Sequence, residues 1–139
     1  MASPMPQTSL FGASALVALG GGTGALLRYH LGRAITVWLG PATVSAFPWA
    51  TLIVNVSGSL AMGLLAGFLA RHGPGGDHWR LLVGVGLLGG FTTFSAFSLE
   101  VMLLMERGQA STAFIYAMIS VLAGVTALYV GLIVMRIAG

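Results

Sequence analysis

The stretch GGFTTFSAFS, residues 89–98, decides how this chain folds, because it places paired glycines, hydroxyls and regularly spaced phenyl rings inside a long apolar segment. Glycine loosens a helix, and a hydroxyl gains nothing by facing lipid, so such a run suits a plain membrane anchor badly. The pattern predicts that something is coordinated at membrane depth.

Composition places the chain in a membrane. Of its 139 residues, 57% are hydrophobic and 6% are charged, whereas a soluble domain carries about 25% charged residues. The net charge of +3 rests on few groups that form no basic stripe, so we expect no nucleic-acid partner. Cysteine is absent, and the three histidines have no metal-ligand spacing. We therefore expect no enzyme.

Four segments are long enough to cross a bilayer, which takes about 20 apolar residues. They are residues 10–27, 49–70, 81–105 and 112–135. Glycine, proline and charged residues separate them. The sequence predicts an all-α membrane protein, with one four-helix domain over residues 1–139 and a flexible tail at residues 1–9.

The arginines give no orientation signal. With four spans, one side of the membrane holds Arg71, Arg80 and Arg136, and the other holds Arg28, Arg33 and Arg107. Equal counts leave the positive-inside rule nothing to act on. Either copies insert both ways and pair as an antiparallel, dual-topology homodimer, or so small a count carries no information.

Pairs of glycines one helical turn apart recur along the spans. They are Gly20 with Gly24, Gly63 with Gly67, and Gly86 with Gly90. This spacing lets helices approach closely in lipid. The pairs predict helix packing and no particular function.

Polar side chains also recur at membrane depth. Asn55 has Ser59 one turn later, and its amide needs a partner, either a neighbouring helix or an ion. Tyr116 and Ser120 share a face of the fourth span and either line a polar path or bond the nearby backbone.

Two charged residues have ambiguous positions. Glu100 is the one acid well inside a span, which makes it a functional candidate. It also lies close enough to the end of the third span to reach a water-filled mouth. Arg28, expected on the last turn of the first span, has the same two interpretations.

The third span contains features that suit ions of both signs. A helix broken near Gly89 and Gly90 releases carbonyl oxygens, which suit a hard cation such as sodium. Phe94 and Phe97 can present positive ring edges to a small anion, with Asn55 as an amide donor. The alternative is that the two phenyl rings bind no ion and only pack against other helices or face lipid.

Three motifs together resemble a known family. GALLRY at residues 24–29, PWATLIVN at residues 48–55 and GGFTTFSAFS at residues 89–98 look like those of the bacterial fluoride channels of the Fluc family, also called CrcB proteins. The resemblance covers all four spans in the same order.

The resemblance implies an antiparallel homodimer with two fluoride pores in the bacterial cytoplasmic (inner) membrane. It also implies a structural sodium ion at the dimer interface, held by the backbone carbonyls of Gly89 and Thr92. The residues that match the pore are Asn55, Phe94, Phe97, Ser95, Tyr116 and Ser120, with Glu100 nearby and Arg28 in the vestibule. One departure is Ala96, where many members have threonine.

Such a channel exports fluoride passively and protects the cell from fluoride toxicity. A membrane potential that is negative inside drives the anion outward by about 2.3 kcal/mol per 100 mV. No phosphate-binding loop is present, so no fuel site is expected. The alternatives are a small dual-topology multidrug or cation–proton antiporter, which would need an acid at the centre of its cavity, and a membrane scaffold that transports nothing.

Overall fold

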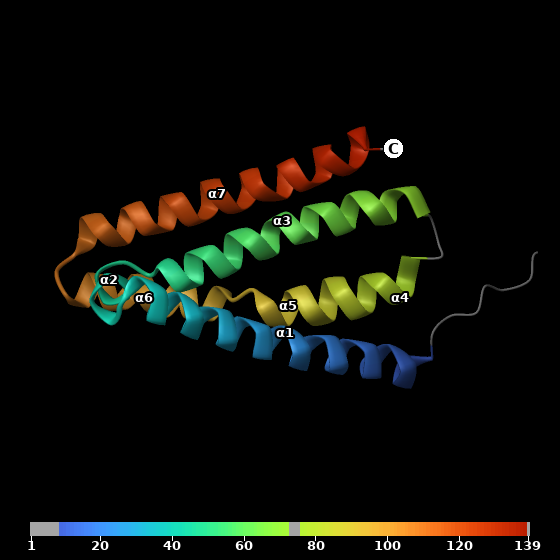
Figure 1. Ribbon diagram of the computed structural model, residues 1–139, viewed down its shortest axis with the longest axis horizontal. Coiled ribbons are helices and arrows are strands. Elements are labelled where there is room, and N and C mark those ends of the chain that lie inside the picture. Colours follow the sequence, from blue (N-terminus) through green and yellow to red (C-terminus); the bar gives the residue numbers. More distant parts are fainter. Residues whose placement is uncertain (1–8, 73–75, 139) are drawn as a thin grey trace, which may run out of the picture.

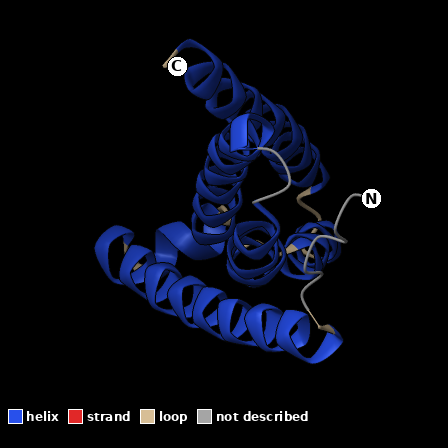
Figure 2. Cartoon of the chain, turned by 90° about the vertical axis from the view of Figure 1, so that its right-hand side faces the viewer, coloured by secondary structure: helices blue, strands red, loops and turns tan. Residues whose placement is uncertain are grey.

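The computed structural model describes residues 9–72 and 76–138, and within these ranges it is helical with no strand (Figures 1 and 2). In chain order the elements are α1 (Leu10–Leu39), α2 (Pro41–Ala46), α3 (Trp49–His72), α4 (Asp77–Trp79), the π-helix η2 (Arg80–Leu88), α5 (Gly89–Phe91), α6 (Phe94–Glu106) and α7 (Ala110–Ile137). The elements from α4 to α6 together form the third span, so four segments are long and apolar enough to cross a membrane. The prediction of an all-α, four-span protein is confirmed. The tail expected at residues 1–9 lies, apart from Ser9, outside the described residues.

The first span is longer than the sequence analysis predicted. Helix α1 continues past residue 27 to Leu39 and ends only at Gly40, whose φ of 86° is followed by Pro41. The apolar pattern continues beyond Arg28, and Ile35 packs as a buried residue. Arg28 therefore lies within α1 rather than on its last turn, and Arg33 belongs to the same helix.

The spans run alternately up and down, and they pack in two interleaved pairs. Helix α3 lies along α7, while α1 lies along η2 and α5 (Figure 1). The short helix α2 closes the corner between α1 and α3 at one end of the bundle (Figure 1). The third span, which contains the motif at residues 89–98, is therefore packed between α1 and the remaining helices.

Glycines let both pairs of helices touch at the backbone. A β-carbon at Gly24 would overlap the carbonyl oxygen of Leu87, and one at Gly63 would overlap the carbonyl oxygen of Leu128. A β-carbon at Gly90 would likewise overlap the backbone of α1. These contacts confirm the close approach that the glycine spacing predicted.

The chain has a small core and a large apolar exterior. Tyr116 and Val54 are its largest fully buried side chains. Of the most apolar 18-residue window of each span, only 6% to 28% is buried. Most of the outer surface is therefore available to lipid or to another protein.

The glycine contacts predict how substitutions act. Gly63→Ala should lower the free energy of unfolding by about 1–3 kcal/mol, because the added methyl group overlaps the backbone of α7. Gly22→Ala is the matched control, since nothing lies within 4 Å of a β-carbon there and alanine favours the helix. Thermal unfolding of both variants in the same detergent measures the difference. Equal stability of the two would contradict the close packing of α3 on α7.

Candidate functional site

The regular helix of the third span is interrupted at two threonines. Thr92 has φ −79° and ψ 157°, and Thr93 has φ −149° and ψ 118°, so both are extended between α5 and α6. Gly89, by contrast, is helical, with φ −63° and ψ −39°, and Gly90 also belongs to α5. The interruption therefore lies just after the glycine pair, near which the sequence analysis expected it.

The side chain of Asn55 holds this interruption from the neighbouring helix α3. Its amide nitrogen Nδ2 donates a hydrogen bond to the carbonyl oxygen of Thr93 at 3.0 Å, and its Oδ1 accepts one from the Thr93 backbone N–H at 2.8 Å. The two bonds satisfy backbone groups that would otherwise be costly to leave unpaired away from water. The sequence predicts two alternative partners for the Asn55 amide, a neighbouring helix or an ion. In the described residues the amide bonds the backbone of the neighbouring third span.

These bonds change the partners of two carbonyl groups. In a continuous α-helix, the N–H of Thr93 would pair with the carbonyl of Gly89, and the N–H of Ala96 with that of Thr92. Here the first N–H is bonded to Asn55, and the second donates to the Thr93 hydroxyl at 3.2 Å. Gly89 and Thr92 therefore lose the donors that a continuous helix would give their carbonyl oxygens.

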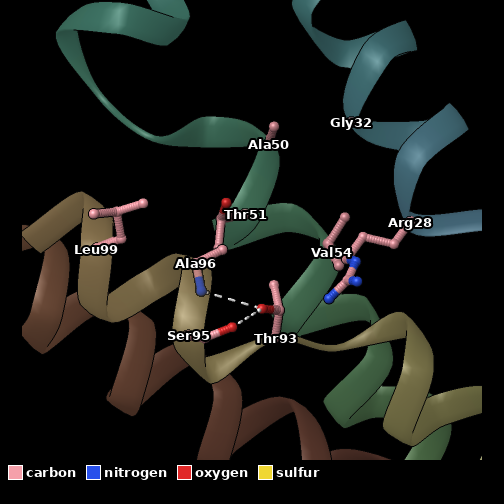
Figure 3. A pocket seen from close by; sticks show the side chains of 9 residues that line it. All are labelled: Arg28, Gly32, Ala50, Thr51, Val54, Thr93, Ser95, Ala96 and Leu99. Carbon is pink, nitrogen blue, oxygen red and sulfur yellow. Dashed lines mark hydrogen bonds between the residues drawn. The ribbon is translucent and has the colours of Figure 1, made fainter. Parts of the chain in front are cut away.

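An open cavity of about 380 Å³ lies beside the interruption (Figure 3). Its lining comes from α1, α3, the interruption and α6, and consists of Arg28, Gly32, Ala50, Thr51, Val54, Thr93, Ser95, Ala96 and Leu99. The guanidinium of Arg28 extends toward Val54 and Thr93 (Figure 3). The hydroxyls of Thr93 and Ser95 lie 3.3 Å apart. The cavity therefore combines one cationic group with several hydroxyls.

A second open cavity, of about 270 Å³, lies next to Asn55. Asn55, Ser59 and Phe94 are among the residues that line it. The ring of Phe94 is 79% exposed, and its centroid lies 5.6 Å from that of Phe97. Thr93 lines both cavities. The interrupted segment therefore borders both recesses, and the exposed Phe94 lines the second.

Glu100 is bonded by hydroxyls from two other helices. Its Oε1 accepts a hydrogen bond from Thr51 on α3, and its Oε2 accepts one from Tyr116 on α7, each at 2.6 Å. The ring of Phe97 packs against that of Tyr116 with centroids 5.3 Å apart. This arrangement links α3, α6 and α7 through one half-buried carboxylate.

Ser120 lies one turn after Tyr116 on α7, as its spacing predicted. Its hydroxyl is buried, and it has no hydrogen-bond partner within the part of the chain that the structure describes. A buried hydroxyl without a partner is uncommon and can bind a ligand or a water molecule. Together with Tyr116 on the same helix and Glu100 on α6, Ser120 forms a row of polar side chains.

Sequence reasoning missed two residues of this site. Thr51 bonds Glu100, and Thr93 bonds Asn55 through its backbone. The signal for Thr51 was its position one helical turn before Asn55 and two turns before Ser59, which puts all three on one face. Thr93 lies inside the quoted motif, but nothing in the sequence identified it as the residue at which the helix opens.

The described ranges contain no cluster of histidine and carboxylate side chains able to hold a metal ion. A cation would therefore have to be held by other oxygens, such as backbone carbonyls. The fold and site together define a multi-pass membrane protein with a cluster of polar side chains and two open cavities at an interrupted helix.

Comparison with known proteins gives the family. The family model described as CrcB-like protein, Camphor Resistance (CrcB), matches residues 15–132, and this chain belongs to that family. The match includes the whole of the interrupted third span.

Three similar relatives each carry the name fluoride-specific ion channel FluC. The protein from Novosphingobium aromaticivorans is 60% identical over 124 residues, which cover 89% of this chain and 96% of that protein. The one from Erythrobacter litoralis is 57% identical over 122 residues, with 87% and 90% covered. The one from Sphingopyxis alaskensis is 52% identical over 120 residues, with 86% and 92% covered. The resemblance drawn from the three motifs is confirmed, and the relatives are named as channels rather than enzymes.

The bonds of Asn55 predict the effect of a near-isosteric change. Asn55→Asp should loosen the interruption, because a carboxylate cannot donate to the Thr93 carbonyl and places negative charge beside it. We expect hydrogen exchange at the amides of residues 93–96 to rise at least about tenfold, which corresponds to roughly 1.4 kcal/mol.

Ser57→Ala is the control on the same helix, because the Ser57 hydroxyl bonds only the nearby Val54 carbonyl at 3.1 Å. In Ser57→Ala, hydrogen exchange at the amides of residues 93–96, measured by mass spectrometry, should equal that of the unaltered protein. Protection at residues 93–96 that survives Asn55→Asp would contradict the role given to this side chain.

Proposed function

We propose that this protein is a fluoride-selective passive channel that exports fluoride from the cell. The observation that carries the proposal is the pairing of Asn55 with Thr93, which holds an interrupted helix next to the Phe94 and Phe97 rings. Relatives with up to 60% identity that are named fluoride-specific ion channels support the choice of ion.

The arrangement of groups supports a pathway without a full charge at its narrow part. Arg28 attracts anions into the first cavity, where Ser95 and Thr93 supply hydroxyl donors. Ring edges of Phe94 and Phe97 then offer weak positive potential. Beyond them, Tyr116 and the unpaired hydroxyl of Ser120 continue the polar groups. Scattered weak donors replace the hydration shell of a small anion without trapping it.

The contacts of Glu100 favour this function over cation–proton exchange. An antiporter needs an acid that is free to exchange protons for cations at the centre of its cavity. Both oxygens of Glu100 accept short hydrogen bonds, from Thr51 and Tyr116. A carboxylate bonded in this way serves as a fixed acceptor that orients the tyrosine.

A second copy in the opposite orientation completes the proposed pore. Phe94 is 79% exposed and the two cavities beside it are open, so one chain alone does not enclose a path. The equal division of arginines between the two sides permits insertion in both orientations. The antiparallel homodimer would hold two pores in the bacterial cytoplasmic (inner) membrane.

The carbonyls of Gly89 and Thr92 suit a structural sodium ion at the dimer interface. Their usual helical donors are bonded elsewhere, and backbone oxygens are ligands that a hard cation accepts. Bound there, sodium would supply fixed positive charge that joins the two copies. It takes no part in moving the anion.

Fluoride efflux from liposomes tests the proposed function. We expect purified protein to release loaded fluoride rapidly and electrogenically, with no proton gradient, while chloride is retained. Phe94→Ile should reduce this flux at least about tenfold, because it removes the ring edge but keeps an apolar side chain. A fluoride electrode follows the release.

Phe114→Ile is the matched control, because Phe114 is a phenyl ring on α7 that is 67% exposed and lines neither cavity. Its flux should equal that of the unaltered protein. No flux from the unaltered protein would favour a scaffold, and flux only under a proton gradient would favour an antiporter.

Removal of sodium tests the proposed cation separately. We expect replacement of all sodium by N-methylglucamine during purification to weaken the dimer and to lower fluoride flux, since the carbonyls of Gly89 and Thr92 would lose their shared ligand. Dimer content by cross-linking and flux from liposomes are measured on the same sample. Restoration of both by added sodium supports the site, whereas indifference of both to sodium contradicts it.

A further inference from the structure

Helix α1 presents an apolar stripe to the outside of the bundle. Leu19, Leu26 and Val37 are 68%, 62% and 77% exposed. At 100° per residue they lie about 100–160° around the helix from Gly20 and Gly24, which pack against the third span. The stripe therefore faces away from the bundle, along the length of a helix that crosses the membrane.

Basic and aromatic side chains interrupt this stripe near the end of α1. A shallow groove there is lined by His30, Arg33, Ala34, Val37 and Trp38. The ring of His30 packs edge-on against that of Tyr29, with centroids 5.2 Å apart, and Trp38 is 81% exposed. An exposed arginine on an outward face needs a counter-charge or water.

The position of the groove along α1 corresponds to the edge of the hydrocarbon core. The 30 residues of α1 span about 45 Å, close to the full thickness of a bilayer with its headgroups. Arg33 lies six residues before the end of α1 at Leu39, hence about 9 Å from that end. A long side chain at this depth reaches the phosphate level by extending toward the headgroups.

None of the three acids, Asp77, Glu100 and Glu106, forms an ion pair with Arg33 among the residues that the structure describes. Asp77 pairs with Arg80 at 3.5 Å, and Glu100 is bonded by hydroxyls on other helices. Arg33 forms no ion pair with any residue in the ranges 9–72 and 76–138. Arg33 is exposed, so its guanidinium is free to pair with an anionic group from outside the described chain.

We propose that the outward face of α1 binds an anionic phospholipid. The phosphate lies against Arg33 and the His30 ring, and Trp38 packs at the level of the glycerol backbone, where tryptophan is favoured. One acyl chain follows Leu26 and Leu19 toward the membrane centre. The apolar stripe beneath the basic groove favours a lipid over free phosphate, and the unbalanced positive charge favours a lipid over a second copy of this face.

Lipid binding to the intact protein tests the proposal independently of any transport. Protein in neutral detergent is titrated with phosphatidylglycerol and, separately, with phosphatidylcholine, and bound lipid is counted by native mass spectrometry. We expect Arg33→Gln to weaken the binding of phosphatidylglycerol about fivefold, the effect of one basic residue near an anionic headgroup. Binding of phosphatidylcholine should change little, and Arg33→Lys should retain most of the preference.

Arg136→Gln is the matched control, because Arg136 is an exposed arginine near the end of α7 and lies outside the groove. It should leave the preference for phosphatidylglycerol intact. If both variants lost the same amount of phosphatidylglycerol binding, the effect would come from net charge alone, and the proposed site would be wrong. Full competition by inorganic phosphate, or a change of oligomeric state in Arg33→Gln, would also overturn it, in favour of a free-anion site or an interface between copies.

Discussion

The pairing of the Asn55 amide with the backbone of Thr93 is the constraint on which the site depends. Inside a bilayer no water is present to bond the backbone N–H and carbonyl groups that an interrupted helix leaves free. An interruption therefore persists only where a neighbouring group replaces the missing hydrogen bonds. Asn55 supplies one donor and one acceptor in the geometry of a peptide group. Because of this replacement, Thr92 and Thr93 are extended at little cost, and α6 begins anew with the Thr93 hydroxyl as its cap.

The interruption organises the groups around it. It turns the first residues of α6 so that Phe94 stands outside the bundle while Phe97 packs against Tyr116. The carboxylate of Glu100, two turns further along α6, then fixes Tyr116 and Thr51. The proposed sites for an anion and for a cation would thus both depend on one local change of backbone direction, and neither would require a buried unpaired charge.

Much of this could be predicted from the sequence, because length and hydropathy decide which segments cross a membrane and because GGFTTFSAFS is an unusual motif in one of them. Three features differ from what the sequence predicts or were missed. The end of α1 was placed too early because Arg28 and Arg33 look like a boundary, although burial of Ile35 continues the helix. The interruption is expected near the glycines because glycine loosens a helix. Its position at Thr92 and Thr93 depends on the Asn55 side chain, which bonds the Thr93 backbone across 38 positions of sequence. Thr51 was missed for the same reason: its partner Glu100 is distant in sequence.

The interleaved packing of the spans has a consequence for biogenesis. The principal partner of α1 is η2, two spans later, and that of α3 is α7, again two spans later. No two consecutive spans therefore form the main contacts of a stable hairpin as they leave the ribosome. The glycine face of α1 stays uncovered until the third span has been made, and that of α3 until the fourth has been made. Each helix can therefore settle its direction across the bilayer before tertiary structure locks it in place.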